Sequence, residues 1–481
     1  MSMLNRDVIF LILEELQNDN KSLYSCLLIN RTWCETTIPI LWRDPTRHNL
    51  TDDACKILFN VILLHLSKES RNNLKNQKIN PFIKTYRKPL FNYISFWRHF
   101  DLCFLERVMN DFKMKNSKLS IFKDEIIKVL INNVNKLISL SIPESFNSHL
   151  FSGIEHCFLE LENFYCDSNI KNNILKTLTV MSTRIKKLEI NVNIKNTNDP
   201  SKIVKLIKVQ KNLKEVNIIY DGKISNENFI YRKTLEESLI KCADTVQYLR
   251  IDWEPITKFL SYLVDLVSLD LAHIKFSYKN WYNLKKVSLP LLKFLKAQYI
   301  PPEILAGIIE NTSGHLIEIS IYHEDLDDTR LIRAIYQNCL NLSYLNLALS
   351  TYSYIEFENL LINCKFLNEL EVVAINNNLG WFNWSRLFEL LTIFSPINLF
   401  KFKFTSINSV WEYRLRDLKL FLSNWKDRRP LLLQIVSKER SCIRRKKQQR
   451  RQNRQQKLKE LLQEYKAKDV IKKYDIIEDD L

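Results

Sequence analysis

The sequence predicts an α/β protein in which an N-terminal helical part precedes a solenoid of strand–helix repeats and a basic C-terminal tail. Three observations support this prediction: a short leucine-rich motif recurs along most of the chain, the first helices carry surplus apolar side chains, and basic residues gather near the end. The chain has 481 residues, of which 46% are hydrophobic and 26% charged, so it has enough apolar material to form a core.

Residues 4–45 predict three short helices with more apolar side chains than they can bury among themselves. From Asp7 to Leu16 the apolar residues cover well over half of the helix circumference, whereas a surface helix usually shows a stripe of little more than about 100°. Asp19 or Asn20 is expected to cap a second helix. Segments of this length rarely sustain a core alone, so the surplus must pack on the following chain or on another protein.

This segment resembles an F-box. The residues that carry the resemblance are Leu4, Asp7-Val8-Ile9, Ile12, Leu16, Leu23, Cys26-Leu27, Ile29-Asn30-Arg31, Trp33 and Pro39-Ile40-Leu41-Trp42. The family pattern opens with Leu-Pro, whereas this chain has Asn5, a residue that can still cap a helix. The alternative interpretation is a generic three-helix cap on a solenoid.

The resemblance implies a partner and a role. F-box segments bind a Skp-type adaptor, which connects them to a cullin–RING scaffold, and the rest of the F-box protein holds a substrate for ubiquitination. The adaptor-binding residues implied here are Leu4, Val8, Ile9, Ile12, Leu16, Leu23, Cys26, Leu27, Ile29, Trp33, Leu41 and Trp42. The protein itself would then be no enzyme.

Residues 47–134 predict a helical connector after an F-box at residues 1–46. Helical apolar spacing covers Asp52–Leu66, the aromatic-rich Tyr93–Met109 and Ile121–Val134.

From residue 135 to 437 the pattern L-x-x-L-x-L recurs, with aliphatic or aromatic substitutes. Ten copies begin at Leu137, Ile185, Leu213, Val246, Leu266, Leu284, Leu316, Leu342, Leu367 and Leu399. A degenerate copy is expected near Leu159-Leu161-Phe164, and a final strand at Leu431–Val436. Helical stretches lie between the copies, and most spacings bracket those of leucine-rich repeats. A set of unrelated core strands is the alternative. With its N-terminal segment, the chain resembles the F-box/leucine-rich-repeat proteins found as large divergent sets in some fungi.

Strand alternation predicts which side chains of the repeats reach the concave face. The candidate substrate-binding residues are Glu189, Glu215, Tyr248, Arg250, Asp252, Asp270, Glu318, Tyr344, Asn346, Glu369 and Glu371. Acidic residues with interspersed tyrosines suit protein recognition, so we expect a protein substrate with a basic or mixed patch.

Residues 438–481 predict a basic, partly disordered tail with one short amphipathic helix. They hold 15 basic and 8 acidic residues and supply +7 of the net charge of +17. A nuclear import signal, a nucleic-acid arm and a solvated tail all fit this composition. The tail lacks interleaved aromatic residues, so we do not expect specific nucleic-acid recognition.

Other classes of function lack their signatures. The five glycines are scattered, which excludes the clustered glycines of phosphate-binding loops. The spacing of His149, His156, Cys157 and Cys166 matches no zinc pattern. We therefore expect no catalytic residue, metal or cofactor. Ten cysteines without a disulfide framework, no signal sequence and no long apolar run predict an intracellular protein, cytoplasmic or nuclear, that does not engage membranes.

Overall fold

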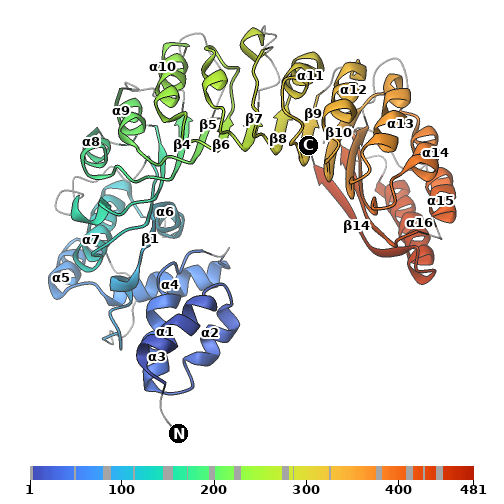
Figure 1. Ribbon diagram of the computed structural model, residues 1–481. Helices are drawn as coiled ribbons and strands as arrows, with labels where there is room; N and C mark the ends of the chain where they lie inside the picture. Colours follow the sequence, from blue (N-terminus) through green and yellow to red (C-terminus); the bar gives the residue numbers. More distant parts are fainter. Residues whose placement is uncertain are drawn as a thin grey trace. The chain divides into compact units, whose positions relative to one another are not determined.

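The computed structural model describes residues 4–47, 50–79, 88–111, 114–144, 155–168, 170, 172–193, 201–221, 229–272, 281–284, 286–323, 327–374, 382–407, 415–425, 428–439 and 448–480. The chain forms two compact units, Met1–Gly222 and Lys223–Leu481. Both consist largely of parallel strands alternating with helices (Figure 1). The structure thus has the repeated strand–helix pattern of a leucine-rich-repeat protein, as the motif predicts.

Unit 1 begins with the three predicted helices, α1 (Arg6–Glu15), α2 (Asn20–Cys26) and α3 (Arg31–Leu41). Each begins at a side-chain cap. Asn5 accepts a hydrogen bond from the Asp7 backbone N–H at 3.4 Å, Asp19 accepts from Lys21 and Ser22, and Asn30 accepts from Trp33 at 3.0 Å. Asn5 therefore does cap the helix where the family pattern has proline.

The connector is only partly as predicted. Helices α4 (Asp52–Leu64) and α7 (Asn116–Asn133) agree with expected helical stretches, whereas α5 (Lys68–Asn76) lies outside all three of them. The aromatic stretch Tyr93–Met109, however, is not one helix. It contains a 3-10 turn η1 (Tyr93–Phe96), strand β1 (His99–Asp101) and helix α6 (Leu102–Asn110), because β1 pairs with the first predicted repeat strand. The parallel strands therefore begin inside the region predicted to be a helical connector.

The remaining elements of unit 1 continue the strand–helix alternation. They are β2 (Ser139–Ile142), η3 (Glu155–Phe158), β3 (Asn163–Asp167), α8 (Asn172–Met181), β4 (Lys187–Asn193), α9 (Ser201–Val209) and β5 (Glu215–Asp221). Strands β1 to β5 pair in chain order, all parallel. Strand β3 is the degenerate copy expected near Phe164, so that prediction is confirmed.

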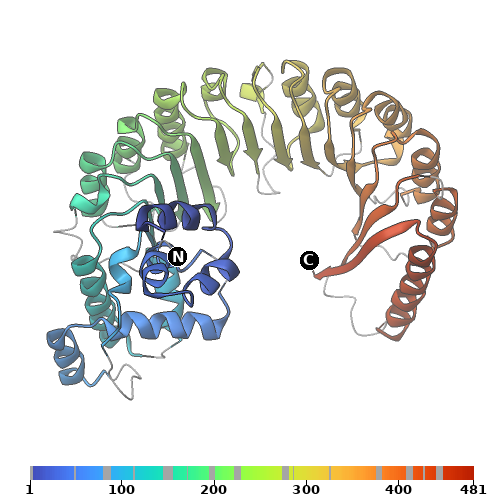
Figure 2. The ribbon, with the colours of Figure 1, turned by 60° about the horizontal axis from the view of Figure 1, so that its bottom comes forward.

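Unit 2 has the same alternation, with its helices on one side of the strands (Figures 1 and 2). Its first elements are α10 (Phe229–Leu239), η6 (Ile240–Cys242), β6 (Tyr248–Ile251), η7 (Phe259–Tyr262), β7 (Ser268–Leu271), η8 (Tyr282–Leu284), β8 (Phe294–Gln298), α11 (Pro302–Glu310) and β9 (Glu318–Tyr322). There follow α12 (Thr329–Asn338), β10 (Tyr344–Leu349), η9 (Thr351–Ser353), α13 (Tyr354–Asn363), β11 (Glu369–Ala374), α14 (Trp384–Phe394), β12 (Lys401–Ile407), α15 (Leu415–Asn424), β13 (Leu431–Glu439), α16 (Gln448–Ala467) and β14 (Ile471–Asp480).

One motif copy is not a strand. The copy at Leu284, Val287 and Leu289 is buried but contributes only the turn η8, and the strand of this repeat is β8, ten residues later. Pro290 follows that copy directly and has no backbone N–H to donate to a strand ladder. The buried residues Leu295 and Ala297 take the inward positions instead.

The array also extends beyond residue 437, where the sequence places its end. Helix α16 and strand β14 form a further repeat, because β14 pairs in parallel with β13 and the Tyr465 hydroxyl lies 2.5 Å from the Ser423 hydroxyl of α15. Leu458, Leu462 and Tyr465 are buried. The helical spacing of these residues predicts the helix, but it does not reveal that the helix belongs to the array.

A single backbone pattern joins successive repeats within each unit. The carbonyl of the residue just before a strand accepts hydrogen bonds from two consecutive N–H groups at the start of the next strand, and we call such a carbonyl a rung. In unit 1 the rungs are Arg98, Ile138, Glu162 and Lys186. The Arg43 carbonyl precedes no strand but accepts the same pair of hydrogen bonds, from Arg98 and His99, so we count it as a rung too. In unit 2 they are Gln247, Val267, Lys293, Ile317, Ser343 and Asn368. The first rung, Arg43, directly follows α3, so the three-helix segment is joined to β1 as one repeat is joined to the next.

Buried carboxylates fix two loops of unit 2. Glu236 of α10 accepts hydrogen bonds from the Trp253 indole at 2.9 Å and from the backbone N–H groups of Ile256 and Thr257. Asp328, just before α12, accepts from the backbone and hydroxyl of Ser350. Because each carboxylate satisfies polar groups that are removed from water, these contacts determine loop position and not a reaction.

Candidate interaction surfaces

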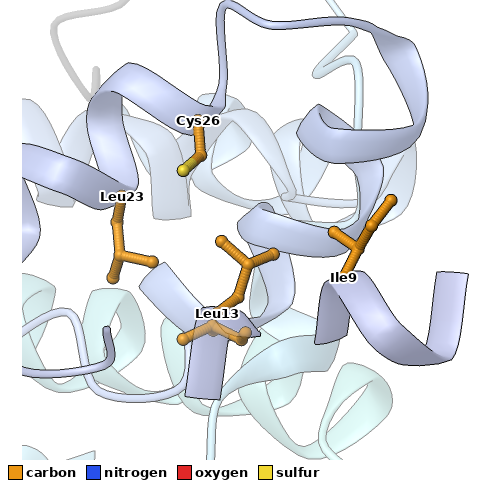
Figure 3. Close-up of a cluster of buried hydrophobic side chains, with 5 residues drawn as sticks. Ile9, Leu13, Leu23 and Cys26 are labelled. Atoms are coloured by element: carbon orange, nitrogen blue, oxygen red, sulfur yellow. The ribbon is translucent and has the colours of Figure 1, made fainter. Parts of the chain in front are cut away.

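Helix α1 has two apolar faces, and only one of them is buried within the protein. Ile9 and Leu13 lie in a buried cluster with Leu23, Cys26 and Ile40 (Figure 3). The opposite face carries side chains at i, i+4, i+7 and i+8 spacing that are exposed. We call these side chains, taken together with the two exposed residues of the turn after α2, the N-terminal apolar surface: Leu4, Val8, Leu11, Ile12, Leu28 and Ile29.

The residues implied by the F-box resemblance fall into three groups in the structure. Those buried in the cluster are Ile9, Leu23 and Cys26. Those partly buried are Leu16, Leu27, Trp33, Leu41 and Trp42. Those exposed are Leu4, Val8, Ile12 and Ile29. The buried group builds the three-helix core, so only the exposed group and the partly buried residues are accessible to a partner.

Two residues of the N-terminal apolar surface were missing from the predicted adaptor-binding residues. Leu11 is 63% exposed and Leu28 is 88% exposed. The helical phase of Leu11 relative to Leu4 and Val8 could have identified it, since these residues share one face of α1. Leu28 follows the end of α2, in a turn where helical periodicity gives no signal.

A cavity of about 750 Å³ lies between the three-helix segment and α4. Tyr24 and Leu27 of the second helix and its turn line one side, and Ile57 of α4 lines another. Trp42 and Tyr93 form part of its wall, with ring centroids 4.5 Å apart. The cavity lies at the junction of the three-helix segment with the connector, and its lining mixes these apolar side chains with polar ones such as Arg43, Asp44 and Arg47.

On the sheets, the predicted alternation of side chains is confirmed. Strand β9, for example, alternates between accessible residues such as Glu318 and buried ones such as Ile319. The predicted substrate-binding residues are accessible to different degrees on the strand face opposite the helices, except Asp252, which follows β6 and is only 9% exposed.

Most acidic side chains of this face are paired with basic ones of a neighbouring strand. Lys187 of β4 contacts Glu215 of β5 at 2.6 Å. In unit 2, Asp270 lies 3.3 Å from Lys296 and 3.9 Å from Arg250, while Arg250 lies 3.4 Å from Asp252.

The same arrangement recurs farther along unit 2. Lys401 contacts Glu369 at 3.1 Å, and Lys403 contacts Glu371 at 2.9 Å. The face is thus a lattice of cross-strand ion pairs, and its acidic charge is largely compensated within the protein. The prediction that this face binds a basic patch stays a prediction, with less free negative charge to support it.

Most of the described cysteines are buried, and they pack as small apolar residues. Burial raises the pKa of the Cys103 and Cys364 thiols to about 12 and that of Cys242 to about 11, which disfavours the reactive thiolate. Within the described part of the chain, no group of three or more His, Cys, Asp or Glu side chains could hold a metal ion. His149 lies outside that part. None of the described helices is both long enough and apolar enough to cross a membrane.

Comparison with known proteins adds little. No family model matches the chain. No curated protein matches it either. Among solved structures, the leucine-rich repeat-containing protein LegL7 from Legionella pneumophila is similar at 14% identity over 65% of this chain and 90% of that chain, with a TM-score of 0.35. The assignment of the repeats therefore rests on the strand order and the rungs of this chain.

Proposed function

We propose that the protein is the substrate-recognition subunit of an SCF-type cullin–RING ubiquitin ligase. The N-terminal apolar surface would bind a Skp-type adaptor, and the repeat array would bind a protein substrate. The protein would bring substrate lysines near a ubiquitin-charged enzyme and perform no chemistry itself.

The observation that carries the proposal is the second apolar face of α1. A helix that serves only as a cap would keep polar residues toward water, whereas α1 exposes Leu4, Val8, Leu11 and Ile12. Exposed apolar side chains gathered in this way are typical of a protein-binding site. The cavity between the three-helix segment and α4 also supports the proposal, because its mixed lining offers apolar contacts of the kind that an amphipathic helix of a partner makes.

The test is co-expression of the full chain with the Skp-type adaptor of the host, followed by size-exclusion chromatography with mass analysis. We expect a 1:1 complex. The double variant Leu11→Asp, Leu28→Asp should lose it without unfolding, because both side chains are exposed. The matched control is Ile355→Asp, an equally exposed apolar residue of unit 2 that should leave the complex intact. A soluble chain that ignores the adaptor contradicts the proposal.

A second candidate is a stand-alone repeat scaffold, or an RNA-binding protein that uses its basic C-terminal part. The rung at Arg43 favours the scaffold, since it joins the three-helix segment to the array as a cap would be joined. The exposed Lys457 and Lys459 of α16 favour RNA binding. A gel-shift titration with single-stranded RNA at two salt concentrations tests the latter, because phosphate contacts weaken steeply with salt.

A further inference from the structure

An exposed apolar row runs along one edge of unit 2, where the chain enters each strand. Its members lie three or four residues before the first residue of β7, β8, β10, β11 and β12. Their exposed fractions range from 46 to 87%, although a leucine between each of them and its strand is buried. This strand-entry row consists of Val264, Leu291, Leu340, Phe366 and Ile397.

Apart from one gap, the row follows the strands from β7 to β12, because these strands pair in parallel and in order. Neighbouring strands are about 4.8 Å apart, so side chains at matching positions of adjacent repeats lie next to one another. The gap in the row is at β9, where Gly314 takes the matching position with φ +77°. A Cβ there would lie 2.9 Å from the Asn338 carbonyl oxygen at the end of α12. The close approach of the backbone therefore explains why this repeat contributes no apolar side chain at Gly314.

The row ends at a recess that is lined by the positively charged side chain of Arg429. The Arg429 guanidinium lies 3.6 Å from the centroid of the Phe400 ring. The Trp425 indole N–H donates a hydrogen bond of 3.0 Å to the Arg429 carbonyl, which fixes the backbone there. Phe366, Phe400 and Arg429 border a recess of about 310 Å³ together with Asn368, Asn398 and Lys401. The stacked guanidinium keeps its N–H groups available for a carboxylate.

The charges beside the row are basic and unpaired, in contrast to those of the open strand face. Lys293, Lys365 and Arg429 are exposed at the same edge. Within the described residues none of the three has an ion-pair partner. The acidic residue of these turns is Asp265, beside Val264 at the far end of the row. A partner that lies along the row therefore meets apolar side chains and an excess of positive charge.

We propose that the strand-entry row binds an extended segment of a partner protein, with apolar side chains on the row and a carboxylate on Arg429. From β7 to β12 the row crosses five strand spacings, about 24 Å, which an extended peptide covers with about seven residues. The inference deepens the proposed function by giving the substrate's chemical class, and it rests on that function only in regarding the partner as a substrate.

The test measures fluorescence anisotropy of a fluorescein-labelled peptide, about eight residues long, with the full chain. The probe peptide alternates leucine with serine and ends in aspartates with a free carboxylate. We expect saturable binding, and binding weaker by about tenfold or more when the aspartates are replaced by lysines or the leucines by serines.

Variants of the chain locate the site. Ile397→Asp and Arg429→Glu should each weaken peptide binding about tenfold. Their matched controls, Ile355→Asp on α13 and Arg416→Glu on α15, make the same chemical change at exposed positions outside the row and should leave binding unchanged. Equal effects of the row variants and their controls would overturn the proposal, and so would an absence of saturable binding. A wild-type dimer that Ile397→Asp dissociates, without peptide binding, would instead assign the row to a second copy of the chain.

The adaptor experiment separates this inference from the proposed function. Ile397→Asp should still form the adaptor complex. Peptide binding by a chain that ignores the adaptor would leave the row as a peptide site and remove the ligase role. An adaptor complex without peptide binding would do the reverse.

Discussion

Helices α1 and α11 have similar length and similar apolar content but place their side chains differently. In α11, seven of nine residues are buried, because it packs against helix α12 and the turn η8 of the neighbouring repeats. In α1, only Ile9 and Leu13 of ten residues are buried, although Val8, Phe10, Leu11 and Ile12 are also apolar. Helix α11 buries nearly all of its apolar side chains within the array, whereas α1 leaves one apolar face exposed.

The comparison shows that the same residue types are buried in one helix and exposed in the other. A buried leucine of the array contributes free energy of folding, whereas an exposed leucine of α1 contributes little to it. Mutations should therefore separate the two regions by their effect on unfolding. Mutations in the connector and in the ion-pair lattice should have smaller effects on unfolding than the loss of a buried leucine of the array.

The sharpest test of the comparison replaces one leucine in each helix by alanine. Leu305→Ala in α11 should reduce the free energy of unfolding by about 3 kcal/mol, because the side chain is fully buried. Leu11→Ala in α1 should change it by less than about 0.5 kcal/mol. Urea unfolding followed by circular dichroism measures both. Similar losses in the two variants would mean that α1 packs on more of the chain than the structure indicates.

A smaller effect is expected for the polar contact that joins two connector helices. Glu125 of α7 is buried and accepts hydrogen bonds of 2.8 Å from Asn73 of α5 and from Lys128. Burial alone would raise the pKa of Glu125, but the hydrogen bonds from Lys128, Ser70 and Asn73 outweigh it and hold the pKa below its usual value. Glu125→Gln should cost about 2 kcal/mol at neutral pH.

The pH dependence of this cost has a definite sign. A carboxyl group whose pKa is lower in the folded state stabilises the protein above its unfolded pKa, and this contribution is lost as pH falls through the folded pKa. The difference between wild type and Glu125→Gln should therefore shrink below about pH 4. A difference that grows on acidification would show that the carboxylate is not held in its charged form.

Helix caps should contribute about 1 kcal/mol each in the N-terminal segment. Asn30 accepts a hydrogen bond of 3.0 Å from the Trp33 backbone N–H at the start of α3. Asn30→Ala should lower the thermal midpoint of unit 1 by a few degrees, and Asn30→Asp should restore most of it. If alanine were neutral, the start of α3 would be fixed by packing of Trp33 and not by its cap.

The smallest effect is expected for the ion-pair lattice. Exchanging the charges of Glu369 and Lys401, 3.1 Å apart, should leave the stability nearly unchanged, whereas either single reversal should cost about 0.5 kcal/mol. A double-mutant cycle in urea measures the coupling. No coupling would mean that these charges are free for a partner, which would restore the prediction of an acidic recognition face.

The sequence predicts the repeats well because each buries a leucine pattern that is visible in one dimension. It misplaces the strand near Leu284, since the motif there is as good as that of β8 and only Pro290 distinguishes them. It also misses β1 and β14. Strand β1 has three residues inside an aromatic stretch, and the polar Lys472, Lys473 and Asp475 of β14 hide its pairing with β13.

For the interaction surfaces, the sequence predicts which residue types are present better than it predicts which side chains are exposed. The surplus of apolar residues in α1 was predictable, but Leu11 and Leu28 required the burial of their neighbours. The pairing of Glu215 with Lys187 depends on strand register, which no local pattern contains. The strand-entry row was likewise hidden, because its residues belong to the turns before the motif.

Because each rung holds the start of the next strand, the position of a strand does not depend on the length of the repeat before it. The interval between consecutive rungs is 20 residues from Gln247 to Val267 but 55 from Arg43 to Arg98, and the hydrogen-bond pattern is the same at both. Insertions and deletions between rungs can therefore accumulate in evolution without moving the neighbouring strands. A chain built in this way can change its loops, and with them its partners, while each unit keeps its fold.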